Sequence, residues 1–351
     1  MIPLLYSLHS GNLYGTERMA LATAPALGPE FQVVIIAPEG PVHGEARRLG
    51  FETIIYRSPL QYLWAIRPYF AAHLRVLSIN TRVLHSLAAA VWERLYWRKS
   101  ANLQVVHGGA QEHLSYGRKK LLRYFGVKQV AVSNYVKERL IANGSDPGGI
   151  RVIENFLTDQ RANPEIIRPV FTQSGVRRVL IVSRLDPIKR IDLLMDAIDL
   201  EPTLRSIEFR ILGSGEDEQR LRQRASEGYP NVHFLGFRSN AAEEMAAADM
   251  LLHLCSEEPF GLAILEAMAA RLPILVPDRG GASDIVVSEV SGMHFYSNDA
   301  RSLASQLHFF KSASADRLNQ FAQGAVKRLL SNYSASYGAR QYRKLIKECW
   351  A

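Results

Sequence analysis

The chain has 351 residues, of which 47% are hydrophobic and 22% are charged, a balance typical of a globular protein long enough for two domains. No apolar run reaches the ~18 residues that a membrane-spanning helix needs. The two cysteines, Cys255 and Cys349, provide neither a disulfide framework nor a metal-binding spacing, which fits a reducing cytoplasm. Residues 1–9 lack a basic region and a small-residue cleavage site, so we expect a first strand there rather than a signal peptide.

The net positive charge of the chain arises entirely from its first half. The formal net charge is +8, and residues 1–158 contain 18 Lys and Arg against 10 Asp and Glu. Many of these cations lie within 94–128, close to four aromatic residues, Trp92, Tyr96, Trp97 and Tyr124. This mixture suits an anionic membrane surface or an acidic acceptor, but an ordinary basic helix face has the same composition. No recognisable binding module supports nucleic acid as a partner.

Apolar, β-rich runs alternate with helical patterns through the first half of the chain. We expect strands at 2–8, 32–37, 52–56, 82–85, 103–107, 128–132 and 150–153. We expect helices at 17–27, 60–78, 87–98 and 134–143. Such alternation predicts a parallel sheet with helices on both faces.

The second half repeats this alternation after a segment without clear periodicity. Residues 157–176 contain three turn-forming residues, Pro164, Pro169 and Gly175, and are interpreted as a linker. Strands are expected again at 177–183, 207–212, 231–235, 249–254 and 273–276. The fold class is therefore α/β, with two Rossmann-like doubly wound domains facing a cleft. The predicted parts are a first domain at 1–158, a linker at 159–176, a second domain at 177–332 and an amphipathic C-terminal helix at 333–351.

Candidate binding residues in the first domain follow its predicted strands. The segment 10–18 joins the first strand to the first helix, and its Gly11 and Gly15 allow close backbone approach to a ligand. His107 ends a strand, where a histidine serves either as a structural hydrogen-bonding group or as a ligand contact. Four weaker candidates also follow strands: His9, Ser133, Asn134 and Asn155.

The second domain opens with two cations at a strand-to-helix corner. Arg184 follows the strand at 177–183, and Asp186 with Pro187 predicts a helix start that places Lys189 in the first turn. Ligands of open α/β sheets bind at this carboxyl edge. The two cations predict an anion-binding site, although Arg184 paired with Asp186 and a solvated Lys189 is the structural alternative. A second turn, with Gly213 and Gly215, permits close backbone approach to a nucleotide or serves as a plain tight turn.

The most specific signal is a pair of glutamates eight residues apart. Glu258 stands at the end of a short apolar strand. Glu266 lies in the second turn of a helix that begins at Leu262, directly after Phe260 and Gly261. Gly261 and the free N–H groups that follow it favour an anion. Without further context, the two residues would be a helix cap and a solvated helix residue.

This segment resembles the E-x7-E motif of retaining glycosyltransferases of family 4, which have the GT-B fold. The similarity continues through 267–277 and through the Gly-Gly-Ala-Ser-Asp segment at 280–284. The resemblance implies that Arg184 and Lys189 bind the diphosphate of a nucleotide sugar. It further implies that Glu266 binds ribose hydroxyls and that Glu258 orients the donor sugar.

The resemblance also implies roles for residues of the first domain. The loop at 10–18 is similar to the family's Gly-Gly-x-Glu-Arg loop, whose amides cover the diphosphate, but Tyr14 stands where the first glycine is common. The family has a histidine at the position of His107 that reaches the donor hexose. Asn155 and Phe156 stand where the family usually has Asn-Gly. In the family the C-terminal helix crosses back to the first domain.

The sequence contains no Asp-x-Asp pair of the kind that holds a cation in metal-dependent glycosyltransferases. We therefore expect metal-independent retaining transfer of a hexose-type sugar, without a cofactor, from a nucleotide-diphosphate donor to a hydroxyl of a glycan, lipid-linked or small-molecule acceptor. Two alternatives remain: a nucleotide-sugar epimerase of the same fold and a non-catalytic, membrane-associated binding protein. The expected location is cytoplasmic, with peripheral association at the inner face of a membrane as a further option.

Overall fold

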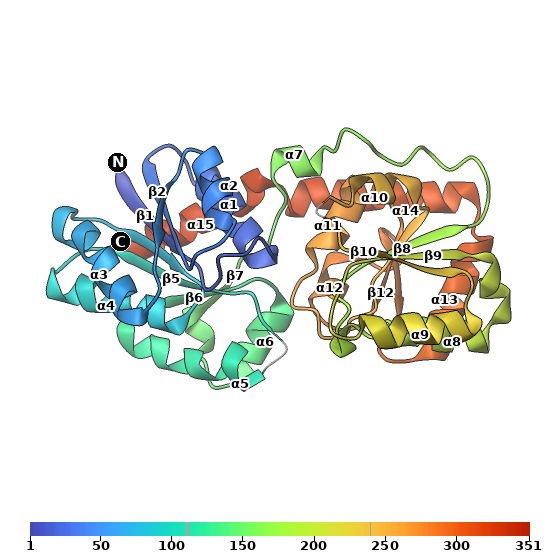
Figure 1. The fold of residues 1–351 in the computed structure, drawn as a ribbon. Coiled ribbons are helices and arrows are strands. Elements are labelled where there is room, and N and C mark those ends of the chain that lie inside the picture. The colour runs from blue at the N-terminus through green and yellow to red at the C-terminus, as the bar shows by residue number, and fades with distance from the viewer. Residues whose placement is uncertain (110–111, 239) are drawn as a thin grey trace. The chain divides into compact units, whose positions relative to one another are not determined.

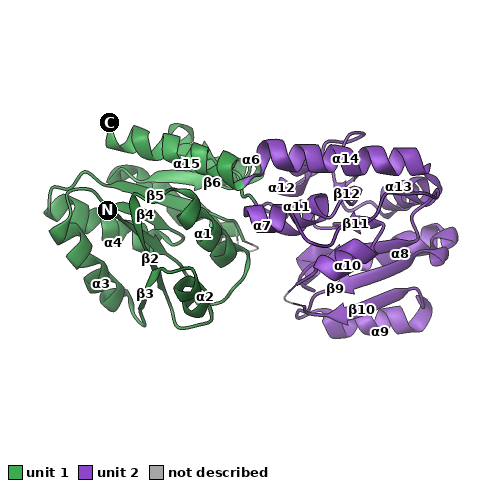
Figure 2. Ribbon diagram, turned by 90° about the horizontal axis from the view of Figure 1, so that it is seen from above, with its two compact units in different colours: residues 1–156, 335–351 green, residues 157–334 purple. Residues whose placement is uncertain are grey.

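The computed structural model describes residues 1–109, 112–238 and 240–351 (Figure 1). The chain forms two compact units, unit 1 with residues 1–156 and 335–351 and unit 2 with residues 157–334 (Figure 2). Each unit is a parallel sheet with helices packed on it, so the predicted fold class of two Rossmann-like domains is confirmed. None of the helices in the described ranges is long and apolar enough to cross a bilayer.

Unit 1 contains a seven-stranded parallel sheet in the order β3-β2-β1-β4-β5-β6-β7. Its strands are β1 Ile2–Ser7, β2 Phe31–Ala37, β3 Glu52–Ile55, β4 Leu77–Asn80, β5 Ala101–Val106, β6 Lys128–Ala131 and β7 Ile150–Val152. The central strands are almost fully buried, as expected of a sheet covered on both faces.

The helices of unit 1 connect consecutive strands, as in other doubly wound folds. They are α1 Gly15–Ala26, α2 Val42–Arg48, α3 Pro59–Ala72, α4 Val83–Leu95, α5 Glu112–Ser115, a 3₁₀ segment Gly117–Phe125 and α6 Asn134–Ala142. The C-terminal helix α15, Ala335–Trp350, also belongs to this unit. The Arg343 guanidinium of α15 donates hydrogen bonds to the carbonyls of Ala26 and Leu27 at the end of α1.

The strand predicted at 82–85 is wrong. The structure has β4 at Leu77–Asn80 instead, and residues 83–95 form α4. β4 lacks the continuous apolar run by which the other strands were predicted, because Ser78 and Asn80 are polar although they are buried. Asn80 Nδ2 donates hydrogen bonds to Ser78 Oγ and to Asn102 Oδ1 of the neighbouring strand, each at 3.0 Å, which satisfies these buried groups.

Unit 2 contains a six-stranded parallel sheet in the order β10-β9-β8-β11-β12-β13. Its strands are β8 Arg178–Val182, β9 Glu208–Leu212, β10 Val232–Gly236, β11 Met250–Leu252, β12 Ile274–Pro277 and β13 Gly292–Phe295. Its helices are α7 Asp159–Ala162, α8 Asp192–Leu200, α9 Glu218–Gly228, α10 Ala242–Ala247, α11 Leu262–Ala269, α12 Gly281–Ile285, α13 Ala300–Ser312 and α14 Ala315–Asn332, with 3₁₀ turns at Pro187–Lys189 and Pro202–Ser206.

The segment interpreted as a linker, 159–176, packs on unit 2. It opens with the one-turn helix α7, which contacts α11. Farther along, the backbone of Phe171 exchanges hydrogen bonds with the Asn319 side chain of α14, and Arg168 N donates to Ala270 O at 3.1 Å. These contacts make the segment a strap along unit 2.

Both sheets gather their loops at the carboxyl ends of their strands. In unit 1, His9 follows β1, His107 follows β5 and Ser133 follows β6. In unit 2, Arg184 follows β8, Gly213 follows β9 and His253 follows β11. Because the strands of each sheet are parallel, the residues named for one unit lie along one edge of its sheet.

Candidate active site

Lys189 and Glu258 form a largely buried ion pair at the carboxyl edge of the unit 2 sheet. Lys189 lies in the turn Pro187–Lys189 after β8, and Glu258 lies in the loop between β11 and α11. Lys189 Nζ is 2.6 Å from Glu258 Oε2, and the two side chains are 13% and 17% exposed. Burial opposes both charges, but the attraction between them raises the pKa of Lys189 and lowers that of Glu258. Both groups are therefore ionised at neutral pH.

The helix start predicted at Pro187 is wrong in detail. Residues 187–189 form a 3₁₀ turn, Arg190 adopts a left-handed conformation with φ of 52°, and α8 begins only at Asp192. Asp186 does not cap this turn with its side chain. Its Oδ2 lies 2.8 Å from Arg184 Nη1, so the pairing considered as the structural alternative is present. The solvated Lys189 of that alternative is absent, because the Lys189 side chain is only 13% exposed and pairs with Glu258.

His253 is a member of this cluster that the sequence interpretation missed. It follows β11, is buried, and places Nε2 3.6 Å from Glu258 Oε2. Burial lowers the pKa of His253 to about 4, so the ring is neutral at pH 7. A polar residue in the apolar run Leu251-Leu-His-Leu was the signal that could have identified it. Cys255 lies next to the same charges, and burial raises the pKa of its thiol to about 11.

Glu266 lies on α11, in its second turn as predicted, and pairs with Arg161 of α7. Arg161 was not considered because its segment was interpreted as a structureless linker. Glu266 is partly exposed, with 21% of its side-chain surface accessible, and it pairs with Arg161 through Oε1.

The glycines of unit 2 bring loops together at this edge. A Cβ added to Gly213 would lie 1.8 Å from Ser183 O, and one added to Gly215 would lie 2.5 Å from the backbone of Leu185. The Gly-Ser-Gly turn therefore packs directly on the loop that carries Arg184. Gly281 N donates to Glu258 O at 2.7 Å, which holds the Glu258 loop from the side of α12.

Three of the residues between the two glutamates, Phe260, Gly261 and Leu262, differ in burial and conformation. Phe260 is buried and packs edge-to-face on Tyr333, with ring centroids 6.0 Å apart, so its side chain anchors the loop. Gly261 has a φ of 107°, a left-handed conformation that favours glycine, and Leu262 opens α11 half-buried. The loop conformation before α11 thus depends on Gly261.

Unit 1 has a cavity of about 380 Å³ at the carboxyl edge of its own sheet. The residues that line it are His9, Thr16, Thr81, Arg82, Val106, His107, Gly108, Leu114, Ser115 and Lys119. None of these described lining residues is Asp or Glu. Burial lowers the pKa of His107 to about 3 and that of Lys119 to about 8. His9 Nδ1 lies 3.2 Å from Thr81 Oγ1, and burial followed by the charges of Arg82 and Lys119 lowers the pKa of His9.

The other candidates of unit 1 lie outside the residues that line this cavity. Ser133 is buried and caps α6, with its Oγ accepting a hydrogen bond from Val136 N at 3.1 Å. Asn134 is exposed in the first turn of α6, and Asn155 is buried after β7. A Cβ on Gly11 would meet the backbone of Glu39 at 2.3 Å, so this glycine packs on the loop after β2. Gly15 opens α1.

Two family models match almost the whole chain. Residues 14–161 match glycosyltransferase family 4, and residues 163–328 match glycosyl transferases group 1. The chain belongs to glycosyltransferase family 4.

Among curated relatives of this family-4 chain, the GDP-mannose-dependent alpha-mannosyltransferase of Mycobacterium tuberculosis is 30% identical over 134 residues, which are 38% of this chain and 33% of the relative. The N-acetyl-alpha-D-glucosaminyl L-malate synthase of Bacillus anthracis is 24% identical over 67% of this chain and 64% of the relative. The alignments therefore span a third to two thirds of these relatives. Anabaena HepE, solved in complex with UDP and glucose, superposes with a TM-score of 0.81 over 99% of this chain and all of its own, at 18% identity. The likeness shows the GT-B fold.

The structure explains one departure of this member from the family pattern. Phe156 stands where a glycine is usual, and its ring lies against Gly338 of α15, where an added Cβ would come within 2.1 Å of the ring. The large and the small residue compensate for each other in volume. The other departure, Tyr14, is largely exposed, and its backbone N–H donates to Glu17 Oε2 at 3.2 Å. Glu17 thereby stabilises the start of α1.

Proposed function

We propose that this protein is a retaining glycosyltransferase that transfers a hexose-type sugar from a nucleotide-diphosphate donor to a hydroxyl acceptor. The observation that carries the proposal is the cluster at the carboxyl edge of unit 2. There the described structure brings together Arg184, Lys189, His253 and Glu258, which come from loops after two neighbouring strands. Family membership and the glycosyltransferase names of the relatives support the same reaction class.

The leaving diphosphate is the group that Arg184 and Lys189 would stabilise. Arg184 is 67% exposed, so its guanidinium can exchange the Asp186 carboxylate for a phosphate oxygen. Lys189 is held rigidly by Glu258, which keeps its ammonium at a fixed place and charged. Preorganised positive charge of this kind contributes ~3–4 kcal/mol per contact to transition-state stabilisation at comparable sites. The sequence has no Asp-x-Asp pair to hold a metal ion on the donor diphosphate, so we propose that transfer is metal-independent.

The two glutamates would bind hydroxyl groups. Glu266 is partly exposed beside Arg161, and a vicinal ribose diol suits a carboxylate acceptor. Glu258 would accept from donor-sugar hydroxyls and orient the ring while remaining paired with Lys189. The acceptor hydroxyl then attacks from the side of the leaving group, and a diphosphate oxygen takes its proton. This front-face course is the basis for proposing retention.

The cavity of unit 1 would contribute the acceptor side. Arg82 and Lys119 line it with no acidic residue among its described walls, so we propose an acceptor that carries a carboxylate or phosphate. His9 is proposed to contact the acceptor and His107 the donor hexose, each as a neutral hydrogen-bonding ring. The amides near Gly15 would cover the diphosphate.

Peripheral membrane association is a second proposal, supported by the exposed aromatic side chains of unit 1. Trp97 is 93% exposed just after α4, and Leu95, Leu121 and Tyr124 are exposed on α4 and the neighbouring 3₁₀ segment. Arg94 belongs to the same surface, and its Nη2 donates to Tyr124 O at 3.0 Å. Sedimentation with anionic liposomes at two salt concentrations tests this surface. Binding that weakens with salt and with Trp97→Ala supports the proposal, and absence of binding at both concentrations rejects it.

The transfer reaction is tested by incubating the protein with UDP-, GDP- and ADP-sugars and a set of anionic acceptors. Nucleotide release is measured together with mass spectrometry of the products. A glycosylated acceptor that forms in the wild type and not in Arg184→Ala supports transfer. A rearranged free sugar with no acceptor product would favour the epimerase. Neither turnover nor donor binding would favour a non-catalytic protein.

A further inference from the structure

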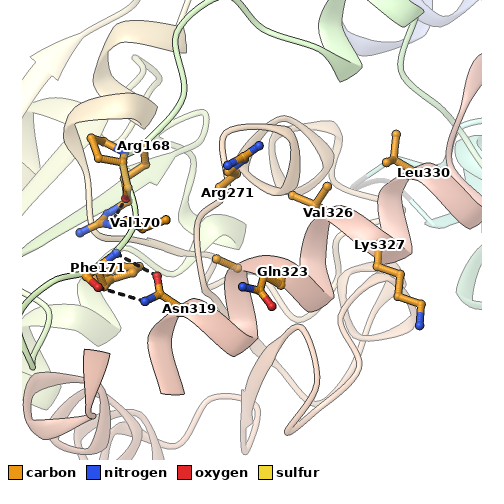
Figure 3. Close-up of a pocket in the computed structure, with 11 residues that line it drawn as sticks. Arg168, Val170, Phe171, Arg271, Asn319, Gln323, Val326, Lys327 and Leu330 are labelled. Atoms are coloured by element: carbon orange, nitrogen blue, oxygen red, sulfur yellow. Dashed lines mark hydrogen bonds between the residues drawn. The ribbon is translucent and has the colours of Figure 1, made fainter. Parts of the chain in front are cut away.

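Unit 2 has a cavity of about 450 Å³, and its lining includes none of the candidate active-site residues. It lies between the strap at 168–171, the turn after α11 and one face of α14 (Figure 3). The volume is within the range of small-molecule sites, about 300–1,000 Å³. Arg271 precedes β12 and lies toward the amino edge of the sheet, whereas Arg184 follows β8 at the carboxyl edge. The cavity is therefore separate from the proposed donor site.

The walls of this cavity are held in place by hydrogen bonds. Phe171 N donates to Asn319 Oδ1 at 2.8 Å, and Asn319 Nδ2 donates to Phe171 O at 3.0 Å (Figure 3). Within the same strap segment, Arg168 Nη2 lies 2.8 Å from Asp249 Oδ1. The strap is thus fixed to α14 and to the rest of the unit, and the cavity is preformed.

The lining is apolar, with cations at its margin. Phe171, Val326 and Leu330 supply apolar surface, and Leu330 is half exposed. None of the described lining residues is acidic. Arg168 is neutralised by Asp249, but Arg271 and Lys327 form no ion pair with any residue in the described ranges. The cavity therefore combines apolar walls with two uncompensated positive charges.

Arg271 occupies a position where glycine is usual. Leu272 N donates to Ala267 O at 3.0 Å and Arg271 N donates to Met268 O at 3.1 Å, which is the Schellman pattern of a helix end. The central residue of this pattern is left-handed, and Arg271 has a φ of 65°. A side chain at this position is unfavourable for the backbone, and here it places a cation at the cavity.

We propose that this cavity binds an amphipathic anion, specifically a fatty carboxylate. Its alkyl chain would lie against Phe171, Val326 and Leu330, and its carboxylate would contact Arg271, with Lys327 adding positive charge at the margin of the cavity. Burial of the alkyl chain makes binding favourable, and the cations favour a head group with negative charge.

Calorimetric titration of the full chain with decanoate, below its micelle concentration, tests the proposal. Hexanoate and octanoate test the role of the chain, because each added methylene that is buried should tighten binding about fourfold, equivalent to ~0.8 kcal/mol. Decanol and decyltrimethylammonium carry the same chain with no charge or the opposite charge. The proposal requires decanoate to bind at least about fivefold more tightly than either, since one charge contact is equivalent to ~1 kcal/mol. Equal binding of decanol or the cation overturns it.

Variants then locate the site. Arg271→Gly removes the cation and inserts the residue that the left-handed position favours, so the melting temperature should stay or rise while decanoate binding weakens about fivefold. Lys327→Gln should weaken binding similarly, and Val326→Glu should abolish it by placing a carboxylate in the wall. Lys344→Gln, an exposed cation of α15, is the matched control and should bind decanoate as the wild type does. Unchanged binding in Arg271→Gly and Val326→Glu would overturn the proposal.

Discussion

The carboxyl edges of the two sheets differ in how their charged side chains are paired. At the edge of unit 2, Lys189 pairs with Glu258, Arg184 with Asp186 and Glu266 with Arg161. The cavity at the edge of unit 1 has Arg82 and Lys119 with no acidic residue among its described walls. The sequence shows the same contrast, because residues 1–158 carry the whole net charge of +8 and the remainder is neutral.

This difference has a consequence for ligand selection. The cations at the unit 2 edge already have carboxylate partners, and an anion that replaces Asp186 at Arg184 leaves that carboxylate without its partner. A nucleotide sugar offers both a diphosphate for Arg184 and hydroxyls for Glu266, and it can satisfy both sets of groups. The cavity of unit 1 has no internal anion to displace, and its positive charge favours any small anion that fits.

The largest effect is expected from breaking the buried pair of unit 2. Glu258→Gln leaves Lys189 buried without its counter-ion, so stability should fall by ~3 kcal/mol and turnover by at least ~10²-fold. The double variant Lys189→Met with Glu258→Gln removes both charges and should regain most of the stability while remaining inactive. Chemical denaturation and donor turnover measure the two quantities. A double variant as unstable as Glu258→Gln would contradict the pairing.

A smaller effect is expected from the pH dependence of the unit 1 cavity. The pKa of Lys119 is lowered to about 8 by burial, so its charge is present below pH 8 and is lost as the pH rises through that value. The KM for an anionic acceptor should therefore rise about fivefold between pH 7 and pH 9, in line with the loss of one charge contact. Lys119→Met should have the higher KM at both pH values. A KM that is independent of pH in the wild type argues against an anionic acceptor in this cavity.

His253 predicts a pH effect on stability. Its pKa is lowered to about 4 from an ordinary value of 6.5, so the unfolded chain binds the proton more readily between these values. Stability should therefore fall as the pH decreases from 6.5 toward 4, at up to ~1.4 kcal/mol per pH unit for this one group. The free energy of unfolding, obtained from denaturation curves at several pH values, should change more steeply with pH in the wild type than in His253→Asn over this window. Identical slopes would show that His253 is not responsible.

The smallest effect tests partner exchange at Arg184. Asp186→Asn removes the competing carboxylate, so a nucleoside diphosphate should bind up to about fivefold more tightly, as expected for an exposed ion pair. Arg301→Ala, which removes an exposed cation on α13, serves as a control and should leave binding unchanged. Weaker binding in Asp186→Asn would mean that Asp186 positions Arg184 instead of competing for it.

The sequence predicted the features that depend on local pattern. The alternation of strands and helices indicated two doubly wound domains, and Gly261 followed by strong helix formers placed the start of α11 at Leu262. It did not predict β4, because Ser78 and Asn80 interrupt the apolar pattern and are satisfied only by contacts within and across the sheet. The pairs Lys189–Glu258 and Glu266–Arg161 join residues 69 and 105 positions apart in the chain. Local patterns contain no information on such contacts, and His253 was overlooked for the same reason.

The diphosphate site of unit 2 is tested by calorimetric titration of UDP, GDP and ADP into the wild type and Arg184→Ala. We expect one diphosphate to bind the wild type with 1:1 stoichiometry and to bind Arg184→Ala at least tenfold more weakly, with Arg301→Ala unchanged. Equal affinity of the wild type and Arg184→Ala for that nucleotide would contradict the assignment of the unit 2 edge as the diphosphate site.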